Sequence, residues 1–210
     1  MINKVMKNKK NVEIKCNAQI EGYSVDPVTK KVTHVNLIGG EKMPCDLVVV
    51  CTGPQTPKHL WHHFGCVLPS ISAQGYGFDF KVDPAHHLGV NILLLNSPYS
   101  MSQYAPGTQR MSAFVDWGCF DKPFVDEKRI AFLHRQLSYD MGMPIEEVKQ
   151  SISKMRPGLR PVSPDEMIIV GPMKHFPNVI INTGYGPWGF YCFAGGKVVE
   201  SLVENTGEAE

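Results

Sequence analysis

The chain has 210 residues, which is enough for one domain or two small ones. Apolar residues make up 43% and charged residues 20% of the sequence, so the composition excludes disorder over most of the chain. The net charge of +1 predicts no electrostatic surface for nucleic acid or an anionic membrane, and the 19 Gly and 16 Pro argue against a purely helical bundle.

The amino-terminal segment, Met1–Lys10, lacks the apolar run of a secretory signal. No stretch of about 18 uninterrupted apolar residues follows it, so we predict no transmembrane helix. The six cysteines form no C-x-x-C pair, which favours reduced thiols over a disulfide framework or a zinc ribbon. We therefore expect a cytoplasmic protein, or one that is peripheral to a membrane.

Alternation of apolar and polar residues predicts three strands in the first part of the chain: Val12–Cys16, Ile20–Val25 and Lys31–Leu37. The turn residues Asp26-Pro27 and Gly39-Gly40 follow the second and third of them. Residues 20–45 are therefore expected to form a small antiparallel meander.

The segment Leu47–Cys51 is a continuous apolar run, which is typical of a strand buried on both faces, as in a parallel sheet. It ends at Thr52-Gly53-Pro54, which predicts a tight turn at the carboxyl end of the strand. Open α/β sheets bind their ligands at such carboxyl ends.

The middle of the chain is rich in Gly, Pro and aromatic residues and contains four strand candidates: Gly75–Phe80, Asn91–Leu95, Met101–Ala105 and Arg110–Val115. Pro106–Gln109 predicts a hairpin turn between the last two. Two amphipathic helices are expected next, one starting near Asp126 and the other near Pro144. The run Arg156–Pro161 contains several helix breakers and predicts a boundary between two parts of the chain.

The last quarter predicts two short strands, Met167–Val170 and Asn178–Asn182, then a glycine-rich loop over Thr183–Gly189 and a helix over Ala194–Val203. Glycine lets a backbone approach a ligand closely, and the N–H groups at the start of a helix attract anions or electron-rich carbonyls. Taken alone, the order of strand, loop and helix is weak evidence for a ligand site, and a plain connecting loop is the interpretation that we favour.

Read together, these motifs resemble a known family. Gly158-Leu-Arg-Pro-x-Ser-Pro-Asp165, then Ile-Val-Gly-Pro, then Asn178-x-x-x-Asn-Thr-Gly-Tyr-Gly-x-x-Gly189 and a helix look like the carboxyl-terminal signature of FAD-dependent amine oxidoreductases. This family includes glycine oxidase, sarcosine oxidase and D-amino acid oxidase, and the sequence looks most like D-amino acid dehydrogenase. The segments Asp46–Gly53 and Val67–Phe78 match further family signatures in the right order.

The resemblance implies an α/β (α+β) fold with a partial FAD-binding Rossmann-like domain and an antiparallel-sheet substrate domain. Residues 1–60 and 155–210 would form the FAD-binding part, and residues 61–154 the substrate-binding part. A complete family member begins with a strand and a G-x-G-x-x-G turn, followed by an acidic residue for the adenosine ribose. We expect no such motif anywhere in this chain, so the chain resembles the carboxyl-terminal half of an enzyme.

The resemblance also implies roles for individual residues. Arg160 would hold the carboxylate of the substrate, since a guanidinium matches a carboxylate in a planar, bidentate way. Tyr104 would place its hydroxyl near the same carboxylate, although packing against a neighbouring strand is the interpretation that we favour. Arg156 is a competitor of Arg160, and Arg110 is equally ambiguous. The residues expected to bind the cofactor are Thr52, Gly53, Gly184, Tyr185, Gly186, Pro187, Trp188 and Gly189.

The expected cofactor is non-covalent FAD, because residues 155–171 contain no Cys for a flavin linkage. By resemblance, the reaction moves a hydride from the α-carbon of a D-amino acid, or a related amine, to the flavin. No acid–base residue of this chain is then required as a catalytic group. Metal binding is not expected, because the adjacent pairs His62-His63 and His86-His87 point in different directions on a strand or a helix.

Two alternatives stay open. The chain could be a non-catalytic remnant or a split subunit that lacks the dinucleotide-binding half and acts only with a second chain or as a homo-oligomer. It could also be a plain β-rich binding module. FAD that copurifies with the chain would favour the enzyme over both.

Overall fold

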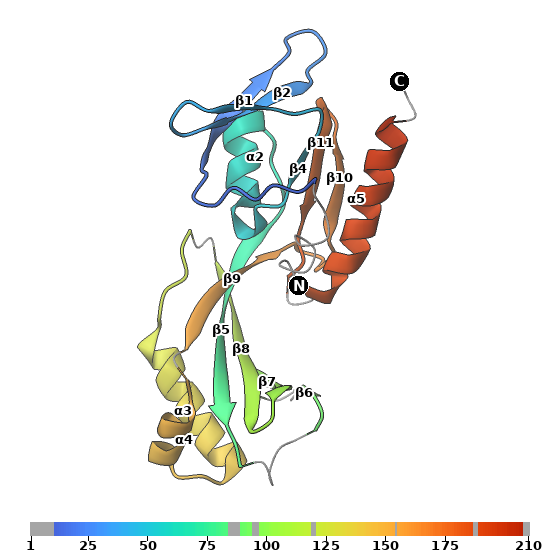
Figure 1. The fold of residues 1–210 in the computed structure, drawn as a ribbon. Helices are drawn as coiled ribbons and strands as arrows, with labels where there is room; N and C mark the ends of the chain where they lie inside the picture. The colour runs from blue at the N-terminus through green and yellow to red at the C-terminus, as the bar shows by residue number, and fades with distance from the viewer. Residues whose placement is uncertain are drawn as a thin grey trace. The chain divides into compact units, whose positions relative to one another are not determined.

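The computed structural model describes residues 11–83, 89–93, 97–118, 121–153, 155–186 and 189–207, and Figure 1 shows its fold. The strands are β1 (Ile20–Val25), β2 (Val32–Leu37), β3 (Lys42–Pro44), β4 (Val48–Val50), β5 (Ile71–Lys81), β6 (Ile92–Leu93), β7 (Tyr99–Ala105), β8 (Thr108–Gly118), β9 (Arg156–Val162), β10 (Ile169–Met173) and β11 (Phe176–Thr183). The helices are η1 (Gly53–Gln55), α2 (Thr56–Phe64), α3 (Glu127–Met141), α4 (Ile145–Ser151), η3 (Gly189–Tyr191) and α5 (Cys192–Gly207). This mixture of helices and antiparallel sheets confirms the predicted fold class.

Two compact units make up the chain. One comprises Met1–Val49 and Pro172–Ile180, and the other comprises Val50–Gly171 and Ile181–Glu210. Both units are discontinuous in sequence, because the chain leaves the first unit near residue 50 and returns to it for part of the β10–β11 hairpin. The predicted division at residues 60 and 154 stays a prediction.

The first unit contains a three-stranded antiparallel sheet with the order β1-β2-β3, as predicted. The buried side chain of Asn178 fixes this sheet to β11: its Oδ1 accepts from the Val32 N–H at 2.8 Å, and its Nδ2 donates to the carbonyls of Val32 and Asp46. The predicted strand over Val12–Cys16 is wrong, because this segment is exposed and pairs with no strand of the described chain. Alternation alone does not make a strand when no partner supplies the hydrogen-bond ladder.

The strand β4 lies at one edge of a second sheet, whose order is β10-β11-β4. Val48 and Val49 are half-buried and Val50 is buried, whereas Cys51 is exposed. The prediction of a strand covered on both faces over Leu47–Cys51 is therefore wrong. The apolar run reflects an edge strand with one well-packed residue.

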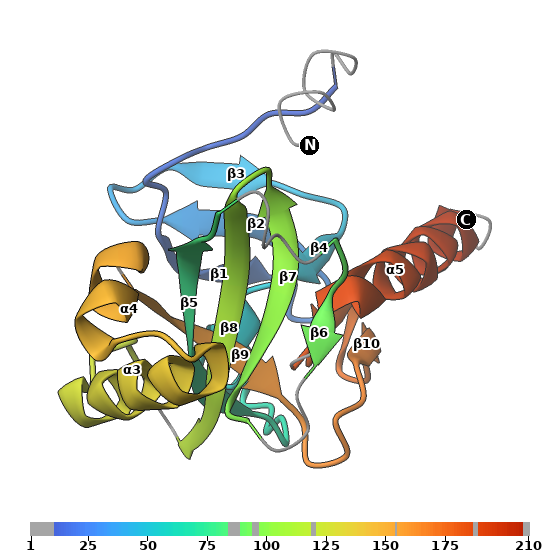
Figure 2. The ribbon, with the colours of Figure 1, turned by 90° about the horizontal axis from the view of Figure 1, so that it is seen from below.

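The second unit contains a five-stranded antiparallel sheet with the order β6-β7-β8-β5-β9. The long strands β5 and β8 run through its centre, and α3 and α4 pack beside it (Figure 2). Apolar residues of the sheet and of both helices form one core, whose fully buried members include Phe78, Met111, Leu133, Leu137 and Val148. The predicted hairpin and both predicted helices are confirmed.

The helix α3 begins where the sequence predicts. Asp126 is its N-cap residue and accepts from the N–H groups of Lys128 and Arg129, which otherwise have no partner within the helix. Its other end is closed by Gly142 in a left-handed conformation with φ of 62°.

The segment Arg156–Val162 corrects the sequence analysis, because it is a strand and not a breaker-rich boundary. It pairs antiparallel with β5, with Arg160 opposite Ala73 and Gly158 opposite Gly75. The strand order places β9 at an edge of the sheet, which is the position where a sheet tolerates proline. Pro157 and Pro161 are therefore compatible with the strand, and Arg160 is held on a regular element.

Candidate functional site

A pocket of about 680 Å³ lies in the second unit beside strands β7, β8 and β9. Its lining residues come from strands, from the loop before β7 and from α3: Leu93, Ser97, Pro98, Tyr99, Ser100, Ser112, Phe114, Val115, Asp116, Arg129 and Arg160. Three of these side chains are charged, and the others are small, apolar or aromatic. This mixture suits a small polar molecule held by a few convergent groups.

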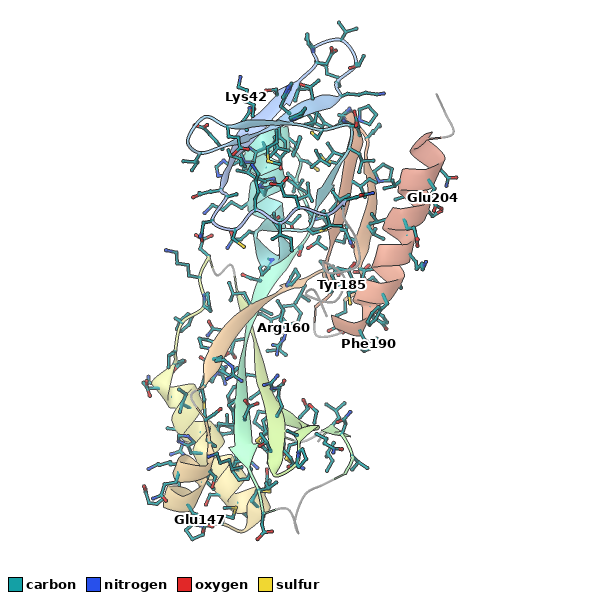
Figure 3. The ribbon with its side chains drawn as sticks, in the orientation of Figure 1. Lys42, Glu147, Arg160, Tyr185, Phe190 and Glu204 are labelled. Carbon is teal, nitrogen blue, oxygen red and sulfur yellow. The ribbon has the colours of Figure 1, made fainter. Side chains whose placement is uncertain are left out.

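Arg160 of β9, labelled in Figure 3, lines this pocket. Its expected role toward a substrate carboxylate stays a prediction. Its Nη1 donates to the carbonyl oxygen of Phe114 at 3.2 Å. Burial lowers the pKa of the Arg160 guanidinium, and no carboxylate of the described chain forms an ion pair with it. A half-buried guanidinium with unused donors is a strong binding group for a carboxylate.

The neighbouring strand makes room for Arg160 at Gly75. A Cβ atom at this position would lie 2.0 Å from Arg160 Nη1 and 2.6 Å from Cζ. The guanidinium therefore rests directly on the β5 backbone, in space that any other residue would fill. Glycine inside a strand often marks such a close approach of another group. Gly75 in the Gly75-Tyr76-Gly77 sequence therefore indicates a close contact that alternation of apolar and polar residues does not.

The carbonyl that Arg160 contacts belongs to a β-bulge. The pairing of β5 with β8 shifts register between Gln74 and Tyr76, and Phe114 lies in the bulge with a φ of 60°. A left-handed conformation is unfavourable for a phenylalanine by about 1–3 kcal/mol and is frequent at functional sites. The bulge turns the Phe114 carbonyl toward Arg160 and places the Phe114 ring in the pocket wall.

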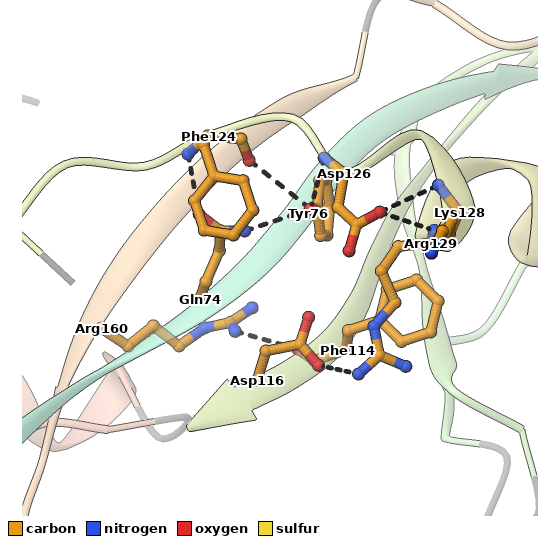
Figure 4. Close-up of polar contacts among 9 residues, drawn as sticks. All are labelled: Gln74, Tyr76, Phe114, Asp116, Phe124, Asp126, Lys128, Arg129 and Arg160. Carbon is orange, nitrogen blue, oxygen red and sulfur yellow. Dashed lines mark hydrogen bonds and ion pairs between the residues drawn. The ribbon is translucent and has the colours of Figure 1, made fainter. Parts of the chain in front are cut away.

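Arg129 and Asp116 form an ion pair in the same pocket (Figure 4). Arg129 Nη2 donates to Asp116 Oδ1. The Arg129 guanidinium carbon also lies 5.0 Å from the centre of the Phe114 ring, within range of a cation–π interaction. Neither residue belongs to a recognisable motif, so the sequence alone does not indicate a functional role for them.

A buried hydrogen-bond network holds the segment that leads into α3 (Figure 4). Gln74 Oε1 accepts from the Phe124 N–H at 2.8 Å, and Gln74 Nε2 donates to the Tyr76 hydroxyl at 3.1 Å. The same hydroxyl accepts from the Asp126 N–H and donates to the Phe124 carbonyl. Because Asp126 caps α3, this network fixes the helix end from which Arg129 reaches the pocket.

The glycine-rich loop after β11 lies next to β9. The Gly186 N–H donates to the carbonyl of Pro161 at 2.7 Å, so the loop is hydrogen-bonded to the residue that follows Arg160. Gly184 and Gly186 have positive φ values of 81° and 45°. A Cβ atom on Gly184 would lie 3.1 Å from backbone atoms of Met167 and Ile169, so a larger residue would fit only if this backbone shifted slightly.

The expected cofactor residues Thr52 and Gly53 meet this loop. The Thr183 hydroxyl donates to the Gly53 carbonyl at 3.3 Å, so the carboxyl ends of β4 and β11 lie side by side. A Cβ atom on Gly53 or Gly189 would have no atom within 4 Å, which leaves their backbone open to a ligand. The structure thus brings Thr52, Gly53, Gly184 and Gly186 together at one edge, and their role toward FAD stays a prediction.

Tyr185 packs within the protein. Its hydroxyl is bonded to Asn182 Oδ1, and a Cβ atom on Gly195 would lie 2.0 Å from the same hydroxyl. Tyr185 therefore lies between β11 and α5 (Figure 3), where it holds the helix against the loop.

Some sequence expectations fall outside what the structure describes. Pro187 and Trp188 lie outside the described residues, and so does the side chain of Tyr104, whose backbone belongs to β7. Tyr99 of the same strand lines the pocket, and its hydroxyl donates to Asp140 Oδ2. The sequence analysis misses Tyr99 because it stands outside the hairpin pattern.

Arg110 and Arg156, the alternatives to Arg160 as the carboxylate-binding residue, both bind Asp79. Arg110 binds Asp79 through two nitrogens, at 2.8 and 3.2 Å, and Arg156 binds the same carboxylate at 3.3 Å. Asp79 thus links β5 to both of its neighbouring strands. These contacts favour structural roles for Arg110 and Arg156.

The spacing of the loop glycines corrects one expectation. Gly184-x-Gly186-x-x-Gly189 itself reads G-x-G-x-x-G, follows a strand and precedes a helix. The chain therefore contains the pattern once, near its carboxyl-terminal end. In a pyrophosphate-binding turn, backbone N–H groups point toward the ligand. The Gly186 N–H instead donates to the carbonyl of Pro161.

Two features are absent from the residues that the structure describes. No group of three or more His, Cys, Asp or Glu side chains in this part of the chain could hold a metal ion. Within the same residues, no helix is long and apolar enough to cross a membrane. His86 and His87 lie outside the described residues.

The match to a family model defines the class of protein. A family model described as FAD dependent oxidoreductase matches residues 7–202, so the chain belongs to this family, whose members use FAD. The chain is similar to a D-amino acid dehydrogenase of Xanthobacter autotrophicus (strain ATCC BAA-1158 / Py2). The two sequences are 28% identical over 178 residues, which cover 82% of this chain and 40% of that protein.

Solved structures share the fold. Glycine oxidase from Geobacillus kaustophilus superposes with a TM-score of 0.73 at 16% identity, over 90% of this chain and 48% of that one. Glycine oxidase from Bacillus cereus ATCC 14579 gives a TM-score of 0.72 at 18% identity, over 92% of this chain and 51% of that one. The chain thus spans about half the length of these relatives, or less.

Proposed function

We propose that this chain supplies the substrate-binding part of an FAD-dependent oxidoreductase that oxidises D-amino acids. One observation carries the proposal: Arg160, whose guanidinium has no carboxylate partner in the described chain, stands one residue from the backbone bond between Pro161 and Gly186. The substrate-binding strand and the glycine-rich loop are therefore fixed to each other. The likeness to a D-amino acid dehydrogenase supports the choice of substrate.

Arg160 binds the α-carboxylate of the substrate in this proposal. Its Nη1 is oriented by the Phe114 carbonyl, and the β5 backbone at Gly75 supports the face of the guanidinium. The remaining N–H groups are available for two parallel bonds to a carboxylate. Such an arrangement fixes the position and the orientation of the amino acid before any bond breaks.

The open backbone at Gly53 and Gly189 fits the approach of a flat ring system, because no atom lies where a Cβ would be. Together with Thr52 and the loop around Gly186, these residues would hold the flavin end of FAD. When bound, FAD supplies the acceptor for the two electrons that leave the amino acid, by hydride transfer in our proposal. This chain's own residues bind and orient the substrate and provide no acid–base group.

A second candidate function uses the same sites without independent catalysis, as a subunit that acts with a partner chain. Exposed aromatic side chains in η3 and at the start of α5 favour it, because Phe190 is 61% and Phe193 69% exposed. Large apolar groups of this kind are common in surfaces that another chain covers.

The test is the reduction of a dye acceptor by the chain supplied with FAD, with D-alanine or L-alanine as substrate. We expect turnover with D-alanine, and a loss of roughly tenfold to a hundredfold in kcat/KM for Arg160→Lys, which keeps the charge but loses the bidentate geometry. Arg156→Lys on the same strand is the matched control and should behave as the native protein.

Three outcomes separate the candidates. Turnover that depends on Arg160 supports the enzyme. Binding of D-alanine that depends on Arg160, without turnover, supports the subunit. Binding and turnover that are unchanged in Arg160→Lys and Arg160→Ala contradict both, and leave Arg160 as a residue of the sheet edge.

A further inference from the structure

The pocket contains more charge than a single carboxylate requires. Its described lining residues carry two guanidiniums, Arg160 and Arg129, and one carboxylate, Asp116. Asp116 is bonded to Arg129 and not to Arg160. The charges of Asp116 and Arg129 offset each other, so among the described lining residues only Arg160 presents an uncompensated positive charge to a ligand.

We propose that Asp116 is a specificity-determining residue: by masking Arg129, it makes the pocket select amino acids with one carboxylate against acidic amino acids. This inference rests on the proposed function, in which Arg160 binds the α-carboxylate. The preferred substrates are then D-amino acids with uncharged side chains. Acidic ones carry a second carboxylate into a pocket that has only one positive charge to offer.

The position of Arg129 is held from three sides. Asp116 binds its Nη2, the Phe114 ring lies 5.0 Å from its guanidinium carbon, and its backbone N–H is bonded to the Asp126 cap. Arg129 thus stays at the pocket wall whether or not Asp116 keeps its charge. Removing the charge of Asp116 should therefore leave the Arg129 guanidinium at the same position, available to a ligand.

Asp116 is the more enclosed partner of the pair. Its side chain is 21% exposed and that of Arg129 is 45% exposed. The carboxylate that masks Arg129 is therefore the less solvated side of the pair. A second carboxylate that enters the pocket finds the Arg129 guanidinium already occupied, which lowers the affinity for acidic ligands relative to neutral ones.

Few other ionisable groups act on this pair. Of the remaining described residues that line the pocket, Tyr99 alone is ionisable, and its hydroxyl donates to Asp140. That bond and burial both raise the pKa of Tyr99, so its phenol is neutral. The selectivity is thus assigned to Asp116 and Arg129 together.

The experiment compares D-glutamine with D-glutamate, which have nearly the same shape and differ by one charge. Binding to the full chain is measured by calorimetry and by the ¹H–¹⁵N signals of the arginine Nε–H groups. The native chain should bind D-glutamine about tenfold more tightly than D-glutamate. Asp116→Asn should remove or reverse this preference, whereas Asp121→Asn, which loses a charge paired with exposed Lys58, should keep it.

A second variant tests whether the effect passes through Arg129. In the background Arg129→Met, Asp116→Asn should no longer increase the affinity for D-glutamate relative to D-glutamine. If Asp116→Asn still increases the relative affinity for D-glutamate in this background, the Asp116 charge acts on the ligand without Arg129, and this result would overturn the proposal. Equal tightening of both ligands by Asp116→Asn would overturn it as well.

The same data separate this inference from the proposed function. If Arg160→Met abolishes binding of both ligands while Asp116→Asn leaves their ratio unchanged, the proposed function stands and the role of Asp116 is wrong. If Arg160→Met changes neither affinity, the carboxylate site itself is wrong. Native thermal midpoints for Asp116→Asn and Arg129→Met confirm that the comparison concerns folded protein.

Discussion

Gly75 occupies a position where the size of one side chain determines the geometry of the site. A methyl group there would overlap the Arg160 guanidinium, whose nearest atom lies 2.0 Å from the Cβ position. The guanidinium is the far end of a flexible side chain, so it can move away without unfolding the sheet. We therefore expect function to be more sensitive than stability at Gly75.

The variant Gly75→Ala tests this expectation. Affinity for a carboxylate ligand such as D-alanine should fall about tenfold, because part of a charge-assisted interaction is lost. The midpoint of thermal unfolding should change little. Calorimetric titration and a thermal melt measure the two quantities. Gly77→Ala is the control, since a Cβ on Gly77 of the same strand has no atom within 4 Å; equal losses in both variants would contradict the argument.

Several elements of the fold can be predicted from sequence, and they share a local cause. The β1–β3 meander and the β7–β8 hairpin are set by alternation and by turn residues, and α3 by the Asp126 cap and its apolar face. The strand β9 could not be predicted this way. Its prolines predict a break, and only the edge position beside β5 makes them compatible with a strand.

The residues of the candidate site also differ in whether the sequence alone indicates them. Arg160 and the glycine loop could be predicted, because they belong to a motif that a family shares. Asp116 and Arg129 could not, because their pairing depends on the bulge at Phe114 and on the start of α3. Contacts between distant segments carry no signal in a single sequence.

The network around Tyr76 predicts how strongly β5 holds the start of α3. Its hydroxyl accepts from Gln74 and Asp126 and donates to Phe124, so all of its bonding capacity is used. Tyr76→Phe should lower the free energy of unfolding by about 1–3 kcal/mol, because buried partners lose their bonds. Urea denaturation measures this loss, with Tyr139→Phe as an exposed control. Amide exchange at Lys128 and Arg129 should accelerate, and unchanged exchange would contradict the role of the network.

Asp79 gives the five-stranded sheet a pH dependence. Hydrogen bonds from Arg110, with those from Arg156, hold the pKa of the Asp79 carboxyl below its usual value of 3.8. A lowered pKa means that the contribution is complete above the ordinary value and is lost as the pH falls through the folded-state value.

The variant Asp79→Asn should therefore destabilise the chain by less than about 1 kcal/mol at pH 7, as expected for a partly exposed ion pair. The difference from the native chain should shrink as the pH falls below the ordinary value of 3.8 and should disappear at more acid pH, below the lowered pKa of Asp79. Urea denaturation at several pH values measures it. A difference that is constant down to acid pH would show that the ion pairs are not its source.

For the whole molecule, we predict weak binding of FAD by the 210-residue chain. A dinucleotide is anchored mainly through its diphosphate at a helix N-terminus, and the loop N–H of Gly186 is already bonded to Pro161. Fluorescence titration should give affinities for FAD and FMN that differ by less than about tenfold, since the flavin ring makes the contacts they share. One FAD retained per chain through gel filtration would contradict this prediction.

The bulge in β8 has a consequence for how the protein can change over evolutionary time. Before it, the buried residues are Gln109, Met111 and Ala113, whereas after it the less exposed positions are Asp116 and Gly118. The extra residue thus changes which side of the strand each position faces. The buried residues before the bulge pack in the domain interior, whereas Asp116 after it lines the pocket. Ligand preference can therefore diversify at Asp116 and its neighbours while the packing that folds the domain is inherited unchanged.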